Sequence, residues 1–107
     1  MIKMLTESNF KSTVSSGVTL IDFYADWCAP CKRLAPILES ASEKLGANSR
    51  ICKVNVDKER DLAHKYGVRS IPTLVVLKNG VLVEQSVGLK DEKTILEIFN
   101  RHANTTV

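Results

Sequence analysis

Segments that resemble β-strands alternate along this chain with segments that resemble helices, and this alternation limits the folds that the chain can adopt. Val18 to Ala25 is a mostly apolar run with β-branched and aromatic residues, which is typical of a strand covered on both faces. After Trp27 the apolar residues recur at helical spacing as far as Gly46, at Leu34, Ile37, Leu38, Ala41 and Leu45. A strand followed by a helix in this way indicates an α/β fold with a central sheet.

The rest of the chain continues the alternation. We expect three further helices: one that Thr6 caps and Gly17 ends, one from Asp61 to Tyr66, and one from Asp91 to Ala103. We expect three further strands, from Ile51 to Asp57, from Thr73 to Leu77 and from Val81 to Gln85. Asn79 and Gly80 favour a tight hairpin turn, so the last two strands should be antiparallel. The sheet is therefore predicted to be mixed, with helices on both of its faces.

The length and composition are those of one globular domain. The chain has 107 residues, of which 44% are hydrophobic and 25% charged, so we expect a single domain over residues 1–107. The longest uncharged apolar run, Thr73 to Leu77, is far shorter than the ~20 residues that a membrane-spanning helix needs. The net charge of +3 arises from scattered basic residues without the interleaved aromatic residues of nucleic-acid-binding patches. We therefore expect neither a membrane nor a nucleic acid as partner.

The N-terminus and the cysteine content indicate where the protein works. Residues Met1 to Met4 lack the apolar stretch of a signal peptide, so we expect the protein to remain in the cytoplasm. Three cysteines are too few, and an odd number, for the disulfide scaffold of a secreted protein. Cysteine should therefore serve chemistry in this chain. The polar tail from Asn104 to Thr106 is expected to fray.

Cys28 and Cys31 have a spacing that is used both by metal sites and by dithiols that cycle to a disulfide. A structural zinc site needs four ligands. The remaining cysteine and the two histidines, Cys52, His64 and His102, occur singly and without metal-ligand spacing. We therefore expect no metal and no bound cofactor, and we interpret Cys28 and Cys31 as a redox pair.

The expected fold places Cys28 where a thiolate is stabilised. Cys28 follows a strand and begins a helical segment, so it should lie at a helix N-terminus, where free N–H groups and the helix dipole favour negative charge. Pro30 has no N–H group, which costs nothing in the first helical turn, and it stiffens the link between the thiols. Ala29 adds neither charge nor bulk. Cys28 is therefore predicted to be the reactive thiol of the pair.

The segment Trp27-Cys28-Ala29-Pro30-Cys31-Lys32 resembles the active-site motif of the thioredoxin family, which usually has glycine at the position of Ala29. The likeness extends over nearly the whole chain. It implies the thioredoxin fold, a mixed sheet of about five strands flanked by about four helices. It also implies a protein-disulfide reductase that acts as a general electron donor and supports cell redox homeostasis. Its partners would be disulfide-containing client proteins and a thioredoxin reductase, usually an NADPH-dependent flavoenzyme, and the protein would be a monomer.

The resemblance also implies catalytic roles for single residues. Cys28 would be the nucleophile and Cys31 the thiol that resolves the mixed disulfide. Asp22, the only charged residue in its apolar run, matches the buried acid of the family, and burial would raise its pKa and suit it to proton exchange with Cys31. For an arbitrary strand, a bulge or a solvated face would be the simpler interpretation of Asp22. Lys53 matches the lysine that neighbours this acid, and an exposed strand lysine is its alternative interpretation.

A second group of residues matches the substrate-binding rim of the family. Pro72 matches a proline whose peptide bond is cis, which would bring the Ile71 backbone against the disulfide to pair with a substrate strand, whereas an ordinary strand-start proline is the alternative. The other rim residues are Trp27, Ala29, Pro30, Val87, Gly88 and Leu89. A small exposed apolar patch of this kind marks a partner site, although each residue taken singly could serve packing.

Two other functions remain open from the sequence. The chain could be a binding module without turnover, which the intact cysteines argue against, or an oxidase or isomerase, which the lack of an export signal and the Ala29-Pro30 dipeptide argue against. The chain also has Tyr24 and Ser70 where many bacterial relatives carry tryptophan and glycine. Because residues between the cysteines tune the redox potential, Ala29 leaves its value open. Cys52 is expected to be a small buried hydrophobe.

Overall fold

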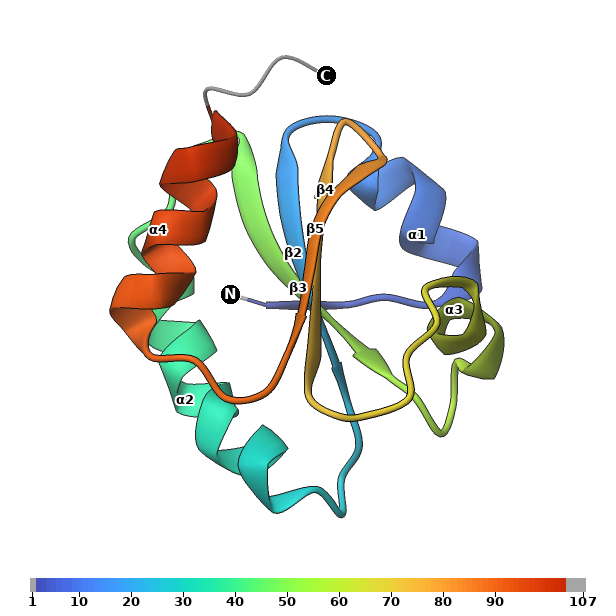
Figure 1. The fold of residues 1–107 in the computed structure, drawn as a ribbon. Coiled ribbons are helices and arrows are strands. Elements are labelled where there is room, and N and C mark those ends of the chain that lie inside the picture. The colour runs from blue at the N-terminus through green and yellow to red at the C-terminus, as the bar shows by residue number, and fades with distance from the viewer. Residues whose placement is uncertain (1, 104–107) are drawn as a thin grey trace.

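The computed structural model describes residues 2–103, and its architecture confirms the predicted α/β fold; the predicted fraying of Asn104 to Thr106 lies outside the described residues. Five strands form one sheet: β1 (Lys3–Met4), β2 (Val18–Tyr24), β3 (Ser49–Asn55), β4 (Thr73–Lys78) and β5 (Val81–Val87). The described residues also form four helices: α1 (Glu7–Val14), α2 (Ala29–Ser42), α3 (Arg60–Lys65) and α4 (Glu92–Ala103). In Figure 1, α2 and α4 lie on one side of the sheet, and α1 and α3 lie on the other.

The central strand of the sheet is β2. The strand order is β1-β3-β2-β4-β5, with β2 parallel to β3 and antiparallel to β4, so the sheet is mixed as predicted. The carboxyl end of β2 leads directly to Cys28 at the start of α2. Because β3 runs parallel to β2, its carboxyl end reaches the same edge of the sheet. That edge is where the sequence predicts the site.

Side chains alternate between the two faces of the sheet and build a separate core on each. The face covered by α2 and α4 carries Val18, Leu20, Ile51, Leu74 and Val76. The face covered by α1 and α3 carries Ile21, Phe23, Cys52, Val54, Val75 and Leu77. Asp22 is in register with Lys53 and with Leu74, and register partners share a face. Asp22 therefore lies on the face covered by the helix that contains Cys31.

Several elements end at other residues than predicted, and α2 and β3 are two examples. Helix α2 stops at Ser42, so Leu45 and Gly46 lie beyond it, although Leu45 still packs against the core on that side. Strand β3 runs two residues ahead of its predicted range because its pairing with β2 begins at Ser49. At its other end Asn55 closes a turn, in which its side-chain Oδ1 accepts a 2.9 Å hydrogen bond from the Asp57 N–H. Asparagine is suited to such turns because its side chain imitates a backbone acceptor.

The positions of the turns agree with the prediction more closely than the ends of the helices and strands do. Asn79 and Gly80 have φ values of +52° and +82°, as the predicted tight turn between β4 and β5 requires. Gly17 has a φ of +76°, although α1 already ends at Val14. The two-residue strand β1 was not predicted as a separate element, because two exposed residues are too short to show a pattern. No helix in the described part of the chain is long and apolar enough to span a membrane.

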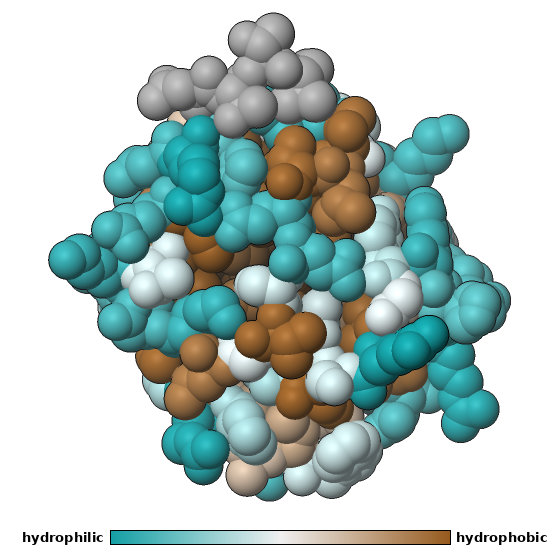
Figure 2. Space-filling view, viewed as in Figure 1, coloured by the Kyte–Doolittle hydropathy of each residue, from teal (hydrophilic) through white to brown (hydrophobic). Residues whose placement is uncertain are grey.

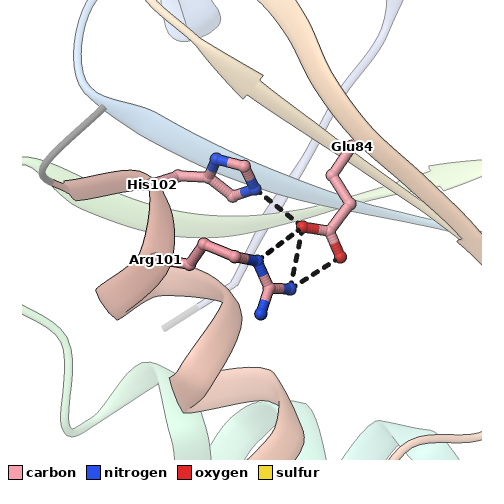
Figure 3. A network of polar contacts seen from close by, with 3 residues as sticks. All are labelled: Glu84, Arg101 and His102. Atoms are coloured by element: carbon pink, nitrogen blue, oxygen red, sulfur yellow. Dashed lines mark hydrogen bonds and ion pairs between the residues drawn. The ribbon is translucent and has the colours of Figure 1, made fainter. Parts of the chain in front are cut away.

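The C-terminal helix is attached to the last strand by charged groups (Figure 3). Glu84 of β5 accepts hydrogen bonds from Arg101 Nη2 at 2.9 Å on both carboxylate oxygens, and its Oε1 lies 2.7 Å from His102 Nε2. Burial raises the pKa of Glu84, but the bonds from His102 and Arg101 outweigh it, so the net shift is downward. The network therefore stabilises the charged form of Glu84.

Apolar side chains are exposed at two places along β5. Figure 2 shows brown, hydrophobic patches between hydrophilic side chains on the face that carries β5. The exposed large apolar residues of the hairpin are Val81 and Leu82, and those at the far end of β5 and just after it are Val87 and Leu89. The second pair belongs to the predicted substrate-binding rim.

Candidate active site

Cys28 and Cys31 form a disulfide at the N-terminus of α2, with their Cα atoms 5.2 Å apart. Cys28 is the N-cap residue, and Ala29 and Pro30 occupy the first turn as predicted. The backbone N–H of Cys31 donates to Cys28 Sγ at 3.2 Å. An N–H group directed at the sulfur, together with the helix dipole, stabilises a thiolate at Cys28 once the bond is reduced. Among the described residues, no group of three or more His, Cys, Asp or Glu side chains is arranged to hold a metal.

The two cysteines belong to a small apolar cluster, against which the loop before β4 packs. Cys28 and Cys31 are each 4% exposed and pack with Ala25, against which Tyr24 and Ile71 also lie. The Ile71–Pro72 peptide bond is cis, as the family resemblance implies. Cys28 Sγ lies 3.8 Å from the Ile71 carbonyl oxygen. The backbone of this loop therefore borders the reactive sulfur.

The segment after β5 lies beside Pro72. The Gly88 N–H donates to the Pro72 carbonyl at 2.9 Å, and Gly88 adopts a φ of +107°, a conformation that glycine accommodates readily. Lys90 Nζ donates to the Val87 carbonyl at 3.0 Å, and this second hydrogen bond also fixes the segment after β5. Val87 is 57% exposed and Leu89 44%. The structure thus brings Val87, Gly88 and Leu89 together with the loop that contacts Cys28.

Trp27 is the most exposed large apolar residue in this region, with 70% of its surface accessible. Its indole Nε1 donates to Asp57 Oδ2 at 2.9 Å, which orients the ring next to Cys28. Asp57 was not predicted as a site residue. Its position just after β3 could have indicated it, because the carboxyl ends of β2 and β3 meet at this edge of the sheet.

Asp22 is fully buried, with an exposed fraction of 0%. Neither of its carboxylate oxygens has a hydrogen-bond partner in the described part of the protein. Burial raises the pKa of Asp22 from 3.8 to about 6, and the positive charge of Lys53 moderates the shift. A carboxyl with this pKa is mostly ionised at neutral pH, yet it accepts a proton much more readily than an exposed aspartate.

Lys53 and Tyr24 lie on the same face of the sheet as Asp22. Lys53 is the register partner of Asp22 on β3, and Tyr24 follows Asp22 by two residues on β2. The Lys53 ammonium is located 4.3 Å from the centroid of the Tyr24 ring and forms no ion pair with Asp22. From the sequence, Tyr24 stands out only as a departure from relatives. The alternation of β2 could have revealed that Tyr24 and Asp22 share a face.

The third cysteine lies away from this site. Cys52 is 1% exposed, is not part of a disulfide, and packs on the face covered by α1 and α3. Burial raises the pKa of the Cys52 thiol, partly offset by the charges of Arg50 and Lys3. These observations confirm the expectation that Cys52 is a buried small hydrophobe.

Comparisons with known proteins agree with this geometry. The model of the Thioredoxin family matches residues 1–101. A curated thioredoxin from Bacillus subtilis (strain 168) is 47% identical over 97 residues, which are 91% of this chain and 93% of that protein. A thioredoxin from Chlamydia caviae is 44% identical over 103 residues, which are 96% of this chain and 100% of that protein.

The fold comparison leads to the same family. The solved structure of a mutant thioredoxin from Halobacterium salinarum NRC-1 superposes with a TM-score of 0.88 at 34% sequence identity. The match covers 98% of this chain and 93% of that one. The members of this family exchange thiols and disulfides with client proteins and with a reductase. The chain belongs to the thioredoxin family and is a thiol–disulfide oxidoreductase that acts through the Cys28–Cys31 pair.

Proposed function

We propose that this oxidoreductase works as a reductase of protein disulfides and as a general electron donor in the cytoplasm. The observation that carries the proposal is the placement of Cys28 at the start of α2, with the Cys31 N–H directed at its sulfur, on the face of the sheet that buries Asp22. The helix N-terminus favours one thiolate, at Cys28. The buried carboxylate of Asp22 disfavours further negative charge nearby, so it disfavours a state in which both cysteines are thiolates. The reduced cysteine pair is therefore suited to giving up its electrons to a client disulfide.

In the first step, the Cys28 thiolate attacks one sulfur of a client disulfide. A bond forms between Cys28 Sγ and that sulfur, and the second client sulfur leaves as a thiolate. The client would dock on the rim formed by Trp27, Ala29, Pro30, Ile71, Pro72, Val87, Gly88 and Leu89. Support comes from the exposure of Trp27, Val87 and Leu89 around a nearly buried sulfur. The Ile71 backbone, which borders Cys28, is suited to pairing with an extended client segment.

In the second step, Cys31 resolves the mixed disulfide. The Cys31 thiol loses its proton, attacks Cys28 Sγ, and displaces the client sulfur as a thiolate, which leaves the Cys28–Cys31 disulfide. We assign Asp22 as the acceptor of the Cys31 proton, because its pKa of about 6 is raised by burial and because it lies on the face under α2. Lys53 modulates Asp22 through its charge.

The cycle closes when a reductase supplies two electrons to the disulfide. We propose a thioredoxin reductase, an NADPH-dependent flavoenzyme, as this partner, and a monomer as the working form. The chain then needs no cofactor of its own, because the Cys28–Cys31 disulfide carries the electrons.

The test is the reduction of insulin disulfides with NADPH and a bacterial thioredoxin reductase. Wild-type protein is expected to turn over, and Cys28→Ser to show no activity above background. Cys31→Ser should stall after the first step and accumulate mixed disulfides that dithiothreitol releases. Cys52→Ser is the matched control and should keep wild-type activity, since Cys52 lies on the other face of the sheet. The proposal fails if wild type does not turn over or if Cys28→Ser remains active.

A further inference from the structure

Tyr24 contacts both parts of the proposed proton-transfer site. Its side chain packs against the apolar cluster that contains Cys28 and Cys31. Its ring also lies under the Lys53 ammonium, with 4.3 Å between Nζ and the ring centroid. An ammonium at this distance from an aromatic face is attracted by the negative potential of the ring. Tyr24 therefore connects the cysteine cluster to the charged group of Lys53, the register partner of Asp22.

The position of Lys53 needs an explanation, because no carboxylate of the described residues holds it. Lys53 is half-buried and forms no ion pair with Asp22, although the two residues are in register on neighbouring strands. A lysine side chain loses much rotamer freedom when it is fixed, and a partly exposed one gains hydration when it extends into water. The Tyr24 ring is the one described aromatic group found over the Lys53 ammonium.

We propose that Tyr24 is a positioning residue that holds the Lys53 ammonium beside Asp22 and thereby sets the pH range in which Asp22 accepts a proton. This inference rests on the proposed function, in which Asp22 receives the proton of Cys31. Without the aromatic ring, the Lys53 side chain extends into water and its charge acts on Asp22 from farther away through a more polar medium. Asp22 then holds its proton to a higher pH.

The other described elements around Asp22 offer no competing cation. Strand β4 presents Leu74 opposite Asp22, and α2 contributes the cysteine pair. Asp26, which follows β2, is exposed. Burial raises the pKa of the Tyr24 hydroxyl, a hydrogen bond with Asn55 lowers it, and the charges of Asp26 and Asp22 raise it further. Among the described residues, the charge of Lys53 is the one that lowers the pKa of Asp22. A change in the position of Lys53 should therefore change the pKa that a titration of Asp22 measures.

The experiment is a carbon-13 NMR titration of the Asp22 carboxyl in the oxidised protein. Tyr24→Leu removes the ring and is expected to raise the Asp22 pKa by about half a unit, roughly a threefold change in its acid dissociation constant. Tyr24→Phe keeps the ring and is the matched control, expected to leave the titration unchanged. Lys53→Met should raise the pKa at least as much as Tyr24→Leu does.

A double variant decides whether Tyr24 acts through Lys53. In the Lys53→Met background, Tyr24→Leu should add no further shift, because the charge that the ring holds is gone. An equal shift in both backgrounds, or no shift in either, overturns the proposal, and so does a shift of Tyr24→Phe that matches Tyr24→Leu.

A measurement on the wild-type protein covers the case in which Tyr24→Leu does not fold. The ε-methylene protons of Lys53 should resonate upfield of free lysine because they lie over the Tyr24 ring, and unshifted resonances overturn the proposal. The titration needs no turnover, so it is independent of the proposed function. A failure of the proposed reductase function appears instead as absent insulin reduction, and a failure of the proposed role of Asp22 as unchanged resolution in Asp22→Asn, whatever the titration gives.

Discussion

Asp22 in β2 and Glu84 in β5 are two acids of the same sheet that are treated in opposite ways. Glu84 accepts hydrogen bonds from Arg101 and lies against His102 Nε2 (Figure 3), whereas Asp22 has no hydrogen-bond partner in the described residues. Burial raises the pKa of both, but the partners of Glu84 turn its net shift downward, while Asp22 reaches a pKa of about 6. The two acids show that a partly or fully buried carboxyl has a lowered pKa when it has hydrogen-bond partners and a raised pKa when it has none, which is the property that the proposed proton exchange of Asp22 needs.

The difference has opposite consequences for stability at neutral pH. An ionised carboxylate without partners in the interior costs free energy, because its hydration is lost and nothing replaces it. A carboxylate that accepts hydrogen bonds from a guanidinium, as Glu84 does from Arg101, regains part of that loss. At neutral pH, ionised Asp22 should therefore destabilise the fold, and ionised Glu84 should stabilise it.

The largest expected effect is on stability, in Asp22→Asn. Because the folded pKa of Asp22 lies above its unfolded value, its contribution to stability is full below pH 3.8 and is lost as the pH rises through about 6. Asparagine removes this loss, so the variant should be more stable by about 3 kcal/mol at pH 8 and by only about half a kcal/mol at pH 4. Urea unfolding of the oxidised protein at both pH values measures this. An equal gain at pH 4 and pH 8 would contradict the titration of a buried Asp22.

The next effect concerns Glu84→Gln, which keeps the size of the side chain and removes its charge. The variant should lose about 1 kcal/mol of unfolding free energy at pH 7, since the Glu84 side chain is 26% exposed and its pairs are partly screened. The lowered pKa of Glu84 gives stability above pH 4.5 that is lost on further acidification, so the difference should shrink there. Insulin reduction should stay at the wild-type rate. A slower reduction would show that this network also serves the active site.

The smallest effect is expected for Asp57→Asn, which weakens an exposed polar contact. Asparagine can still accept a hydrogen bond from the Trp27 indole, but without the charge, and stability should change by less than about 1 kcal/mol. The orientation of Trp27 should loosen, so KM for insulin should rise about twofold while kcat is kept. The measurement is steady-state kinetics together with Trp27 fluorescence, and a fall in kcat at constant KM would argue against a docking role.

Much of the sheet could be predicted from the sequence because its elements are strongly patterned. The apolar run from Val18 and the helical spacing of Ile95, Ile98 and Phe99 identify elements whose residues are indeed buried. The ends of elements were harder to predict. Whether Leu45 belongs to α2, and where β3 begins, depends on packing and on strand register, which local patterns do not contain.

In the site, too, some features could be predicted from local sequence patterns and others depend on packing. The redox pair Cys28 and Cys31 could be predicted from its spacing, and the burial of Asp22 from the family resemblance, while the role of Asp22 stays a prediction. The contact of Trp27 with Asp57 and that of Tyr24 with Lys53 join residues that are far apart in the chain. Such contacts form only when β2 and β3 pair, so they cannot be predicted from a local sequence motif.

The central claim is that Asp22 is left without hydrogen-bond partners because it exchanges a proton with Cys31. Its most direct test is the rate of the resolution step, followed by stopped flow as release of a client from its mixed disulfide with Cys28, from pH 5 to pH 9. The wild-type rate should rise through an apparent pKa near 6, the value for Asp22. In Asp22→Asn that rise should disappear, and the rate at pH 7 should fall roughly tenfold. Equal rates and equal pH profiles in the two proteins would contradict the account.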